Sequence, residues 1–188
     1  MRASSEQAVR VSPRPGGGPA FRLRATGLIA VALAAALTAG PPALGEVGGE
    51  ALDFQATTTG GERVEAKELA GRWVLLDFWG TWCVPCIAAF PKLQQLQDDH
   101  PETLSVVGLA FFSGTGDAVA AFAAQHEVRY TIWMGTEELI QKFGVIAFPS
   151  YFLIDPEGEV VLAIVGESGD LYGEVSALLP AEPTPTAP

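Results

Sequence analysis

The chain has 188 residues, and once a leader of about 45 residues is set aside, the remainder suits one folded domain rather than two. Residues 1–45 carry five Arg and one Glu, so residues 46–188 carry 6 Lys and Arg against 21 Asp and Glu, a net charge of −15. A domain this acidic repels phosphate backbones and anionic lipid headgroups, which argues against nucleic acid as a partner and against membrane binding by the domain itself.

The N-terminal segment has the layout of an export signal. Arg22 and Arg24 precede residues 25–39, an uncharged and mostly apolar run of 15 residues, and small residues follow as far as Gly45. A helix that spans a bilayer needs about 20 apolar residues, so we expect cleavage near Gly45, with an uncleaved signal-anchor as the alternative. The sequence therefore predicts an export leader at residues 1–45 and a periplasmic or other extracytoplasmic domain, for which the membrane is a partner only if the leader is uncleaved.

The first part of the domain has the pattern of a hairpin followed by a parallel strand–helix–strand unit. Two nearly continuous apolar runs are typical of central strands that are covered on both faces. The helix between them makes the connection of a right-handed parallel pair. The predicted elements are a hairpin of residues 52–57 and 62–64, a helical turn at 65–69, a strand at 73–79, a helix at 83–99 and a strand at 104–111.

The second part ends in a predicted antiparallel strand pair around a turn at Gly158. The Pro-rich tail, residues 180–188, cannot hold a helix and is predicted to be disordered. Together the segments predict an α/β domain over residues 46–179, with a mixed central sheet of four to five strands, helices on both faces and the hairpin as an N-terminal extension. The remaining elements are helices at 117–126, 137–143 and 169–179 and strands at 130–134, 150–155 and 159–165.

Cys83 and Cys86 carry the strongest functional signal. They are the only cysteines, which excludes a framework of several disulfides and a four-cysteine zinc site. At positions i and i+3 of a helix start, their sulfurs lie on one face within bonding reach. The unpaired N–H groups of the first turn favour a thiolate at Cys83, whereas Cys86, one turn deeper, is expected to be buried and protonated. The spacing predicts a redox-active dithiol, with a structural disulfide or a metal-binding pair as alternatives.

Two segments resemble landmarks of the thioredoxin superfamily. The stretch from Trp73 to Cys86, which ends in Trp79-Gly80-Thr81-Trp82-Cys83-Val84-Pro85-Cys86, resembles its active-site segment, and the export signal points to the TlpA/ResA-like branch. The stretch Phe148-Pro149-Ser150-Tyr151-Phe152 resembles the strand that a cis proline opens opposite the Cys-x-x-Cys site. The resemblance spans about residues 52–179 and implies a thioredoxin fold and thiol-disulfide exchange with protein substrates.

The resemblance also implies roles for single residues. Cys83 matches the attacking cysteine, Cys86 the resolving cysteine, Pro149 the cis proline and Trp82 the aromatic residue beside the nucleophile. Asp77 falls where thioredoxins keep a buried carboxylate beneath the resolving cysteine, although many members of the TlpA/ResA-like branch have Asn there. Burial would raise the pKa of this carboxyl group, and as a base it would accept the proton of Cys86.

Two further positions on the active-site helix can be compared with the family. Pro91 matches the proline that kinks this helix. Ala89 stands where the TlpA/ResA-like branch commonly has Glu, so a role in cytochrome c maturation does not follow from the resemblance.

The expected reaction is reduction of substrate disulfides, because exported members of this branch are generally reductants that a membrane electron donor recharges. The same dithiol run in reverse would oxidise its substrates. No cofactor and no metal are expected. The alternatives are a peroxidase on the same fold and, from a different class, a non-catalytic copper-delivery or adaptor module on a thioredoxin scaffold.

Overall fold

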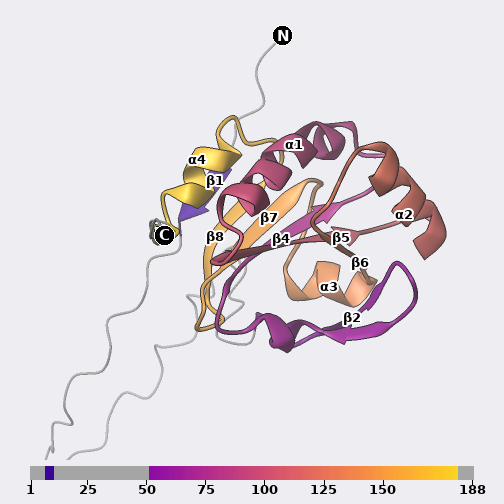
Figure 1. Ribbon diagram of the computed structural model, residues 1–188, viewed down its shortest axis with the longest axis horizontal. Coiled ribbons are helices and arrows are strands. Elements are labelled where there is room, and N and C mark those ends of the chain that lie inside the picture. Colours follow the sequence, from indigo (N-terminus) through magenta and orange to yellow (C-terminus); the bar gives the residue numbers. More distant parts are fainter. Residues whose placement is uncertain (1–6, 11–50, 182–188) are drawn as a thin grey trace, which may run out of the picture.

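The computed structural model describes residues 7–10 and 51–181 of the chain. Its strands form one mixed sheet in the order β1-β8-β7-β4-β5-β6-β2-β3, with helices on both faces (Figure 1). The strands are β1 (Gln7–Arg10), β2 (Gln55–Thr58), β3 (Arg63–Glu65), β4 (Trp73–Trp79), β5 (Leu104–Ala110), β6 (Thr131–Met134), β7 (Ser150–Ile154) and β8 (Val160–Val165). The helices are the 3-10 turn η1 (Ala66–Leu69), α1 (Val84–Asp99), α2 (Gly116–Gln125), α3 (Glu137–Lys142) and α4 (Leu171–Ser176).

The centre of the sheet agrees with the prediction. β4 and β5 are parallel and are joined through α1, β6 is parallel to β5, and the antiparallel pair β7 and β8 lies on the other side of β4. Every residue of β4 after Trp73 is buried, because neighbouring strands flank it and helices cover both of its faces. The continuous apolar pattern therefore predicted this central strand correctly.

The sheet is wider than the predicted four to five strands. The predicted N-terminal hairpin, β2 and β3, extends this sheet, because β2 pairs antiparallel with β6. At the opposite edge, β1 lies within the predicted leader and pairs antiparallel with β8, which would otherwise present unpaired backbone groups there. No strand was expected at Gln7–Arg10, because a four-residue edge strand leaves little trace in the sequence.

Other predictions fall on residues outside those that the structure describes. These are the apolar run at residues 25–39, the processing position at Gly45 and the tail from residue 182 onward. Within residues 7–10 and 51–181, no helix has the length and apolar character needed to cross a bilayer.

The buried side chains form two apolar layers, one on each face of the sheet. The first layer lies under α1, α2 and α4, and the second lies under α3 and η1. Alternation along β4 divides its side chains between them, with Leu75 and Trp79 in the first layer and Leu76 and Phe78 in the second. The same alternation places Asp77, between Leu75 and Trp79 on its strand face, toward the layer that also contains both cysteines.

Candidate active site

Three loops meet at the edge of the sheet that is formed by the carboxyl ends of the parallel strands β4 and β5. β4 ends at Trp79 beside Ala110, the last residue of its parallel neighbour β5. β7 runs the other way and begins at Ser150, which pairs with Phe78 near the end of β4. Three connections are therefore neighbours: the one that follows β4, the one that follows β5 and the one that precedes β7. They are far apart in the sequence.

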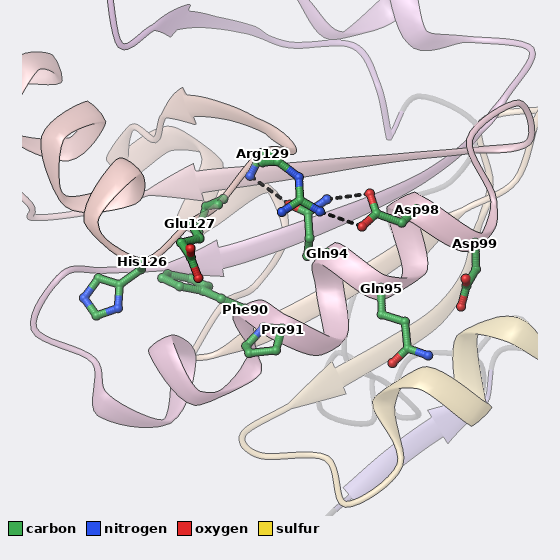
Figure 2. A pocket seen from close by; sticks show the side chains of 10 residues that line it. Phe90, Pro91, Gln94, Gln95, Asp98, Asp99, His126, Glu127 and Arg129 are labelled. Carbon is green, nitrogen blue, oxygen red and sulfur yellow. Dashed lines mark hydrogen bonds and ion pairs between the residues drawn. The ribbon is translucent and has the colours of Figure 1, made fainter.

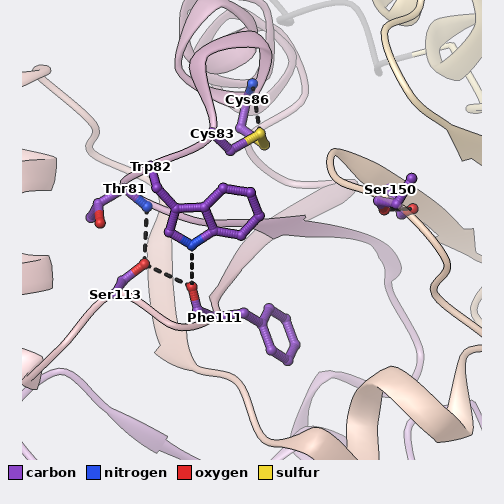
Figure 3. The surroundings of a disulfide bond; sticks show 8 residues. Thr81, Trp82, Cys83, Cys86, Phe111, Ser113 and Ser150 are labelled. Carbon is purple, nitrogen blue, oxygen red and sulfur yellow. Dashed lines mark hydrogen bonds between the residues drawn. A yellow bond between two sulfur atoms is a disulfide. The ribbon is translucent and has the colours of Figure 1, made fainter.

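The two cysteines form a disulfide at this edge, where α1 begins. Cys83 is the N-cap of α1, its Cα atom lies 5.3 Å from that of Cys86, and their sulfurs are bonded. The Cys86 N–H donates to the Cys83 Sγ over 3.3 Å, so this sulfur takes the acceptor place that an oxygen has in most helix caps (Figure 3). Partial positive charge at the helix N-terminus favours a thiolate at this position once the disulfide is reduced.

In the disulfide form both cysteines are buried, as was predicted for Cys86. Cys86 is 1% exposed and Cys83 only 4% exposed, rather than open to solvent. The bond draws the Cys83 sulfur toward Cys86, and both side chains belong to the apolar layer beneath α1.

Trp82 forms one wall beside the disulfide. Its indole N–H donates to the Phe111 carbonyl over 3.2 Å, and its ring meets that of Phe148 edge to face at 5.4 Å between centroids. The Ser113 hydroxyl accepts from the Thr81 N–H and donates to the same carbonyl, each over 2.9 Å, which ties the active-site loop to the segment after β5 (Figure 3).

Gly80 is required for this arrangement. A Cβ atom at Gly80 would lie 2.6 Å from the Trp82 Nε1 and 2.9 Å from the Phe111 carbonyl oxygen. These distances are shorter than van der Waals contact, so any side chain here would displace the indole from the carbonyl that holds it.

Pro149 directly precedes β7, on the loop whose Phe148 ring contacts Trp82. The peptide bond between Phe148 and Pro149 is cis. The Pro149 carbonyl accepts from the Gly166 N–H over 2.8 Å, and the Ser150 hydroxyl donates to the Ala147 carbonyl over 2.7 Å. These bonds fix the loop whose Phe148 ring contacts both Trp82 and Phe111.

Asp77 is buried beneath this edge, in the middle of β4. It is 1% exposed, and neither carboxylate oxygen has a hydrogen-bond partner in the part of the chain that the structure describes. Burial disfavours the charged form and raises the pKa of Asp77 well above its ordinary value, while the Tyr130 hydroxyl acts in the opposite direction. Across the sheet Asp77 pairs with Tyr151, whose pKa is raised by burial and by the negative charge of Asp77.

Exposed apolar side chains surround the disulfide. In the described part of the chain, four large hydrophobic residues are more than half exposed; three stand on the loops of this edge, and the fourth, Val84, is the first residue of α1. Two of them, Trp82 and Phe112, connect through the Phe148 and Phe111 rings, which contact one another. We call this set the apolar rim; its members are Trp82, Val84, Phe112 and Ile146.

Two residues near the site, Glu167 and Phe112, were not predicted from the sequence. Ala89 lines a cavity of about 60 Å³ beside Pro85, together with Tyr151 and Glu167, so a carboxylate does stand near the position where Ala89 replaces Glu. Glu167 is distant in the sequence, and no local motif points to it. Phe112 does carry a signal that could have been used, since an apolar residue directly after a predicted strand is unusual in a polar loop.

A larger cavity lies away from the disulfide, between α1 and the connection from α2 to β6 (Figure 2). Its volume is about 380 Å³, and its wall includes the ion pair of Asp98 and Arg129 at 2.7 Å. The backbone N–H of Arg129 also donates to the Gln94 Oε1 over 2.8 Å. None of the five predicted site residues lines this cavity. Within residues 7–10 and 51–181, no group of three or more His, Cys, Asp or Glu side chains is arranged to hold a metal ion.

The site thus gathers all five predicted residues. Cys83, Cys86, Trp82 and Pro149 meet at the edge of the sheet, and Asp77 lies beneath them on the face that α1 covers. A mixed sheet of this order with a Cys-x-x-Cys disulfide at the start of its first long helix defines the class of thioredoxin-fold oxidoreductases.

Comparison with known proteins agrees with this class. The AhpC/TSA family pattern matches residues 47–163. The thiol-disulfide oxidoreductase ResA of Bacillus subtilis (strain 168) is 35% identical over 133 residues, which cover 70% of this chain and 73% of the relative. ResA of Bacillus thuringiensis subsp. konkukian (strain 97-27) is 35% identical over 123 residues, 65% of this chain and 71% of the relative.

Solved structures give the same result. A secreted disulfide oxidoreductase of Mycobacterium tuberculosis, homologous to DsbE of E. coli, superposes with a TM-score of 0.58 at 27% identity and covers 69% of this chain and 98% of its own. A thiol:disulfide interchange protein of the thioredoxin family from Chlorobium tepidum TLS superposes with a TM-score of 0.58 at 28% identity, covering 66% and 91%. The chain belongs to the AhpC/TSA family and is a thiol-disulfide oxidoreductase similar to ResA. The resemblance to the thioredoxin superfamily and its ResA-like branch is confirmed.

Proposed function

We propose that this protein is an exported reductase of disulfides in protein substrates. The observation that carries the proposal is the Cys83–Cys86 disulfide at the N-terminus of α1, above a buried carboxylate on the same face of the sheet. In this mechanism the Cys83 thiolate attacks a substrate disulfide and forms a mixed disulfide. Cys86 then attacks the Cys83 sulfur and releases the reduced substrate, so two electrons pass from the dithiol to the substrate.

The other three site residues act on these two steps. Asp77 takes the proton of Cys86 before the second attack. Trp82 and Pro149 form the walls between which the substrate disulfide approaches Cys83, a role supported by their places on the two loops that flank it. A membrane electron donor returns the Cys83–Cys86 disulfide to the dithiol, since an oxidising compartment does not supply those electrons.

The direction of exchange is tested by the reduction potential of the Cys83–Cys86 pair, together with insulin reduction driven by a chemical reductant. A reductase is expected to have a potential near that of thioredoxin, about −270 mV, whereas an oxidase would lie near about −120 mV. A potential at the second value would overturn the reductive direction. Failure to accelerate insulin reduction would favour the adaptor or metal-delivery alternative.

The apolar rim supports protein rather than small-molecule substrates, because exposed apolar side chains gathered at one site mark a surface for protein contact. Phe112→Asn tests this, since Phe112 has a φ of 52° and Asn tolerates that left-handed backbone. This variant loses about 1 kcal/mol of apolar contact with a protein substrate, so its KM for a protein disulfide is expected to rise about fivefold. Its rate of reduction of hydroxyethyl disulfide, a small molecule, is expected to stay unchanged.

Glu127→Asn is the matched control for this variant. Glu127 has the same left-handed conformation, with a φ of 58°, but lies on the connection after α2 and lines the cavity away from the disulfide. The control is expected to reduce both substrates as the wild type does. An unchanged KM for protein disulfides in Phe112→Asn would remove the apolar rim from substrate binding.

Export rests on the leader, residues 1–45, and is supported by the secreted relative from Mycobacterium tuberculosis. We expect N-terminal sequencing of the protein from its native host to start near residue 46, followed by the domain over 46–179 and the tail over 180–188. Cleavage there removes β1 and leaves β8 as the edge strand of the mature sheet. Recovery from the membrane with Met1 retained would mean that residues 25–39 are an anchor. Recovery from the soluble cytoplasm with Met1 retained would contradict export.

A further inference from the structure

The layer beneath α1 contains an unusual set of buried polar atoms. Both carboxylate oxygens of Asp77, the Trp79 indole Nε1 and the Tyr130 hydroxyl have no hydrogen-bond partner within the described residues. All three side chains are more than nine-tenths buried. A buried polar group without a partner costs about 1 to 3 kcal/mol, and so many in one layer point to a function.

The neighbouring parallel strand, β5, explains how these polar groups come together. Asp77 pairs with Gly108 of β5 in the parallel register. A Cβ atom at Gly108 would lie 2.8 Å from the Trp79 Nε1 and 3.2 Å from the Tyr130 Cε2. The absence of a side chain at Gly108 therefore lets the indole N–H and the phenol ring extend over β5 beside the carboxylate.

The two groups that share this space with Asp77 are both hydrogen-bond donors. Burial raises the pKa of Asp77 and so favours its protonated form, and a protonated carboxyl group cannot accept the proton of Cys86. A donor that stabilises the anion is therefore needed, and the Tyr130 hydroxyl does lower the pKa of Asp77. The other titratable side chains in or against this layer are Tyr151 on β7, the cysteines on α1, Tyr172 on α4, Glu167 beside Tyr151, and His126, whose ring contacts Phe90.

We propose that Tyr130 is a positioning residue for the resolving step, whose hydroxyl, with the Trp79 indole N–H, holds the Asp77 carboxylate in its ionised form. The inference rests on the proposed role of Asp77. When the Cys86 S–H bond breaks, its proton passes to the carboxylate and forms an O–H bond there. The Cys86 thiolate attacks the Cys83 sulfur, the bond from Cys83 to the substrate breaks, and the substrate cysteine leaves as a thiolate. Tyr130 keeps its own proton throughout.

The test compares Tyr130→Phe with Tyr172→Phe, which removes a hydroxyl that donates to Asp99 over 2.8 Å at the surface of α4. The titration of Asp77 is followed by carbon-13 NMR of its carboxyl group in the oxidised protein. In the proposal the Tyr130 hydroxyl donates to the carboxylate once it is ionised. Loss of this donor is therefore expected to move the midpoint about one pH unit higher in Tyr130→Phe and to leave it in place in Tyr172→Phe.

The same variants are followed in single-turnover release of substrate from the mixed disulfide. The pH dependence of the release rate in Tyr130→Phe is expected to shift by the same interval. Release is about tenfold slower than wild type on the acidic side of the Asp77 midpoint and equal to wild type on the alkaline plateau. A folded Tyr130→Phe protein with the wild-type Asp77 midpoint would overturn the proposal. If this variant does not fold, Gly108→Ala, which presses on the Trp79 and Tyr130 rings from β5, must move the midpoint in the same direction.

Asp77→Asn separates failure of this inference from failure of the proposed function. If Asp77→Asn resolves mixed disulfides as fast as wild type, Asp77 is not the proton acceptor and the proposed role falls. If Asp77→Asn is slow while Tyr130→Phe changes neither the titration nor the profile, only the role of Tyr130 falls. In an Asp77→Asn background, Tyr130→Phe is expected to leave the release rate unchanged.

Discussion

Cys86→Ser is expected to accumulate a mixed disulfide between Cys83 and its substrate, close to one equivalent per chain, because the group that resolves it is gone. Cys83→Ser is expected to trap nothing and to reduce insulin no faster than the chemical reductant alone. The asymmetry follows from position: Cys83 caps α1, where N–H groups favour a thiolate, and Cys86 lies one turn deeper. Non-reducing electrophoresis and intact mass measure the adduct.

Alkylation of the reduced protein tests the same assignment without substrate. Iodoacetamide is expected to modify Cys83 much faster than Cys86 near neutral pH, since the thiolate is the reacting form. Equal rates for the two thiols, or trapping through Cys86 in the Cys83→Ser variant, would contradict the division of roles. The wild-type protein treated in parallel serves as the control for adducts that resolve.

Asp77→Asn is expected to slow resolution of the mixed disulfide about a hundredfold, the lower range for a lost general base, while attack by Cys83 on a substrate disulfide keeps its rate. The amide has nearly the shape of the carboxylic acid but does not accept the proton. Stopped-flow measurement of the two steps separates them. A variant in which both steps slow together would point to a structural role instead.

The same substitution is expected to change how stability depends on pH. The folded-state pKa of Asp77 lies above its ordinary value of 3.8, so between these two pKa values the unfolded chain is ionised while the folded protein keeps the proton. The free energy of unfolding is unaffected below the unfolded pKa and falls by about 1.4 kcal/mol per pH unit across that interval. Asp77→Asn removes this loss and is expected to be the more stable protein at mildly alkaline pH.

Urea denaturation of the oxidised proteins from about pH 4 to about pH 9 measures the difference in free energy of unfolding between wild type and Asp77→Asn. Over this range an Asp with a raised pKa loses its proton. Asp98→Asn is the control, because that carboxylate is exposed at the surface, where it pairs with Arg129. It is expected to keep the wild-type slope. Parallel curves for wild type and Asp77→Asn would show that Asp77 does not hold a buried proton.

The elements that carry chemistry were predictable because their signals are local. The apolar run of Trp73–Trp79 identified β4, and the spacing of Cys83 and Cys86 located the start of α1 to within one residue. Burial of Asp77 followed from its place in that run. In each case neighbouring residues in the sequence contain the information, since strand and helix patterns repeat over a few residues.

The remaining features depend on contacts between distant segments. The pairing of β2 with β6 joins strands far apart in the sequence, and no pattern within either strand specifies its partner. The hydrogen bond from the Thr81 N–H to the Ser113 hydroxyl joins residues that are 32 positions apart in the sequence. Tyr130 looked like an ordinary first residue of a strand, and its position beside Asp77 depends on Gly108 in the strand between them. Such relations arise only when the sheet assembles.

The apolar rim is exposed, on loops and at the first residue of α1, whereas the disulfide and its proton acceptor are buried, and this separation has an evolutionary consequence. Val84, Phe112 and Ile146 make up most of the rim, and exposed positions of this kind usually tolerate substitution within about 0.5 kcal/mol of stability. A lineage can therefore exchange the residues that select a substrate without repacking the layer that sets the electron chemistry. One redox module can be retargeted to new client proteins by changes confined to a few surface positions.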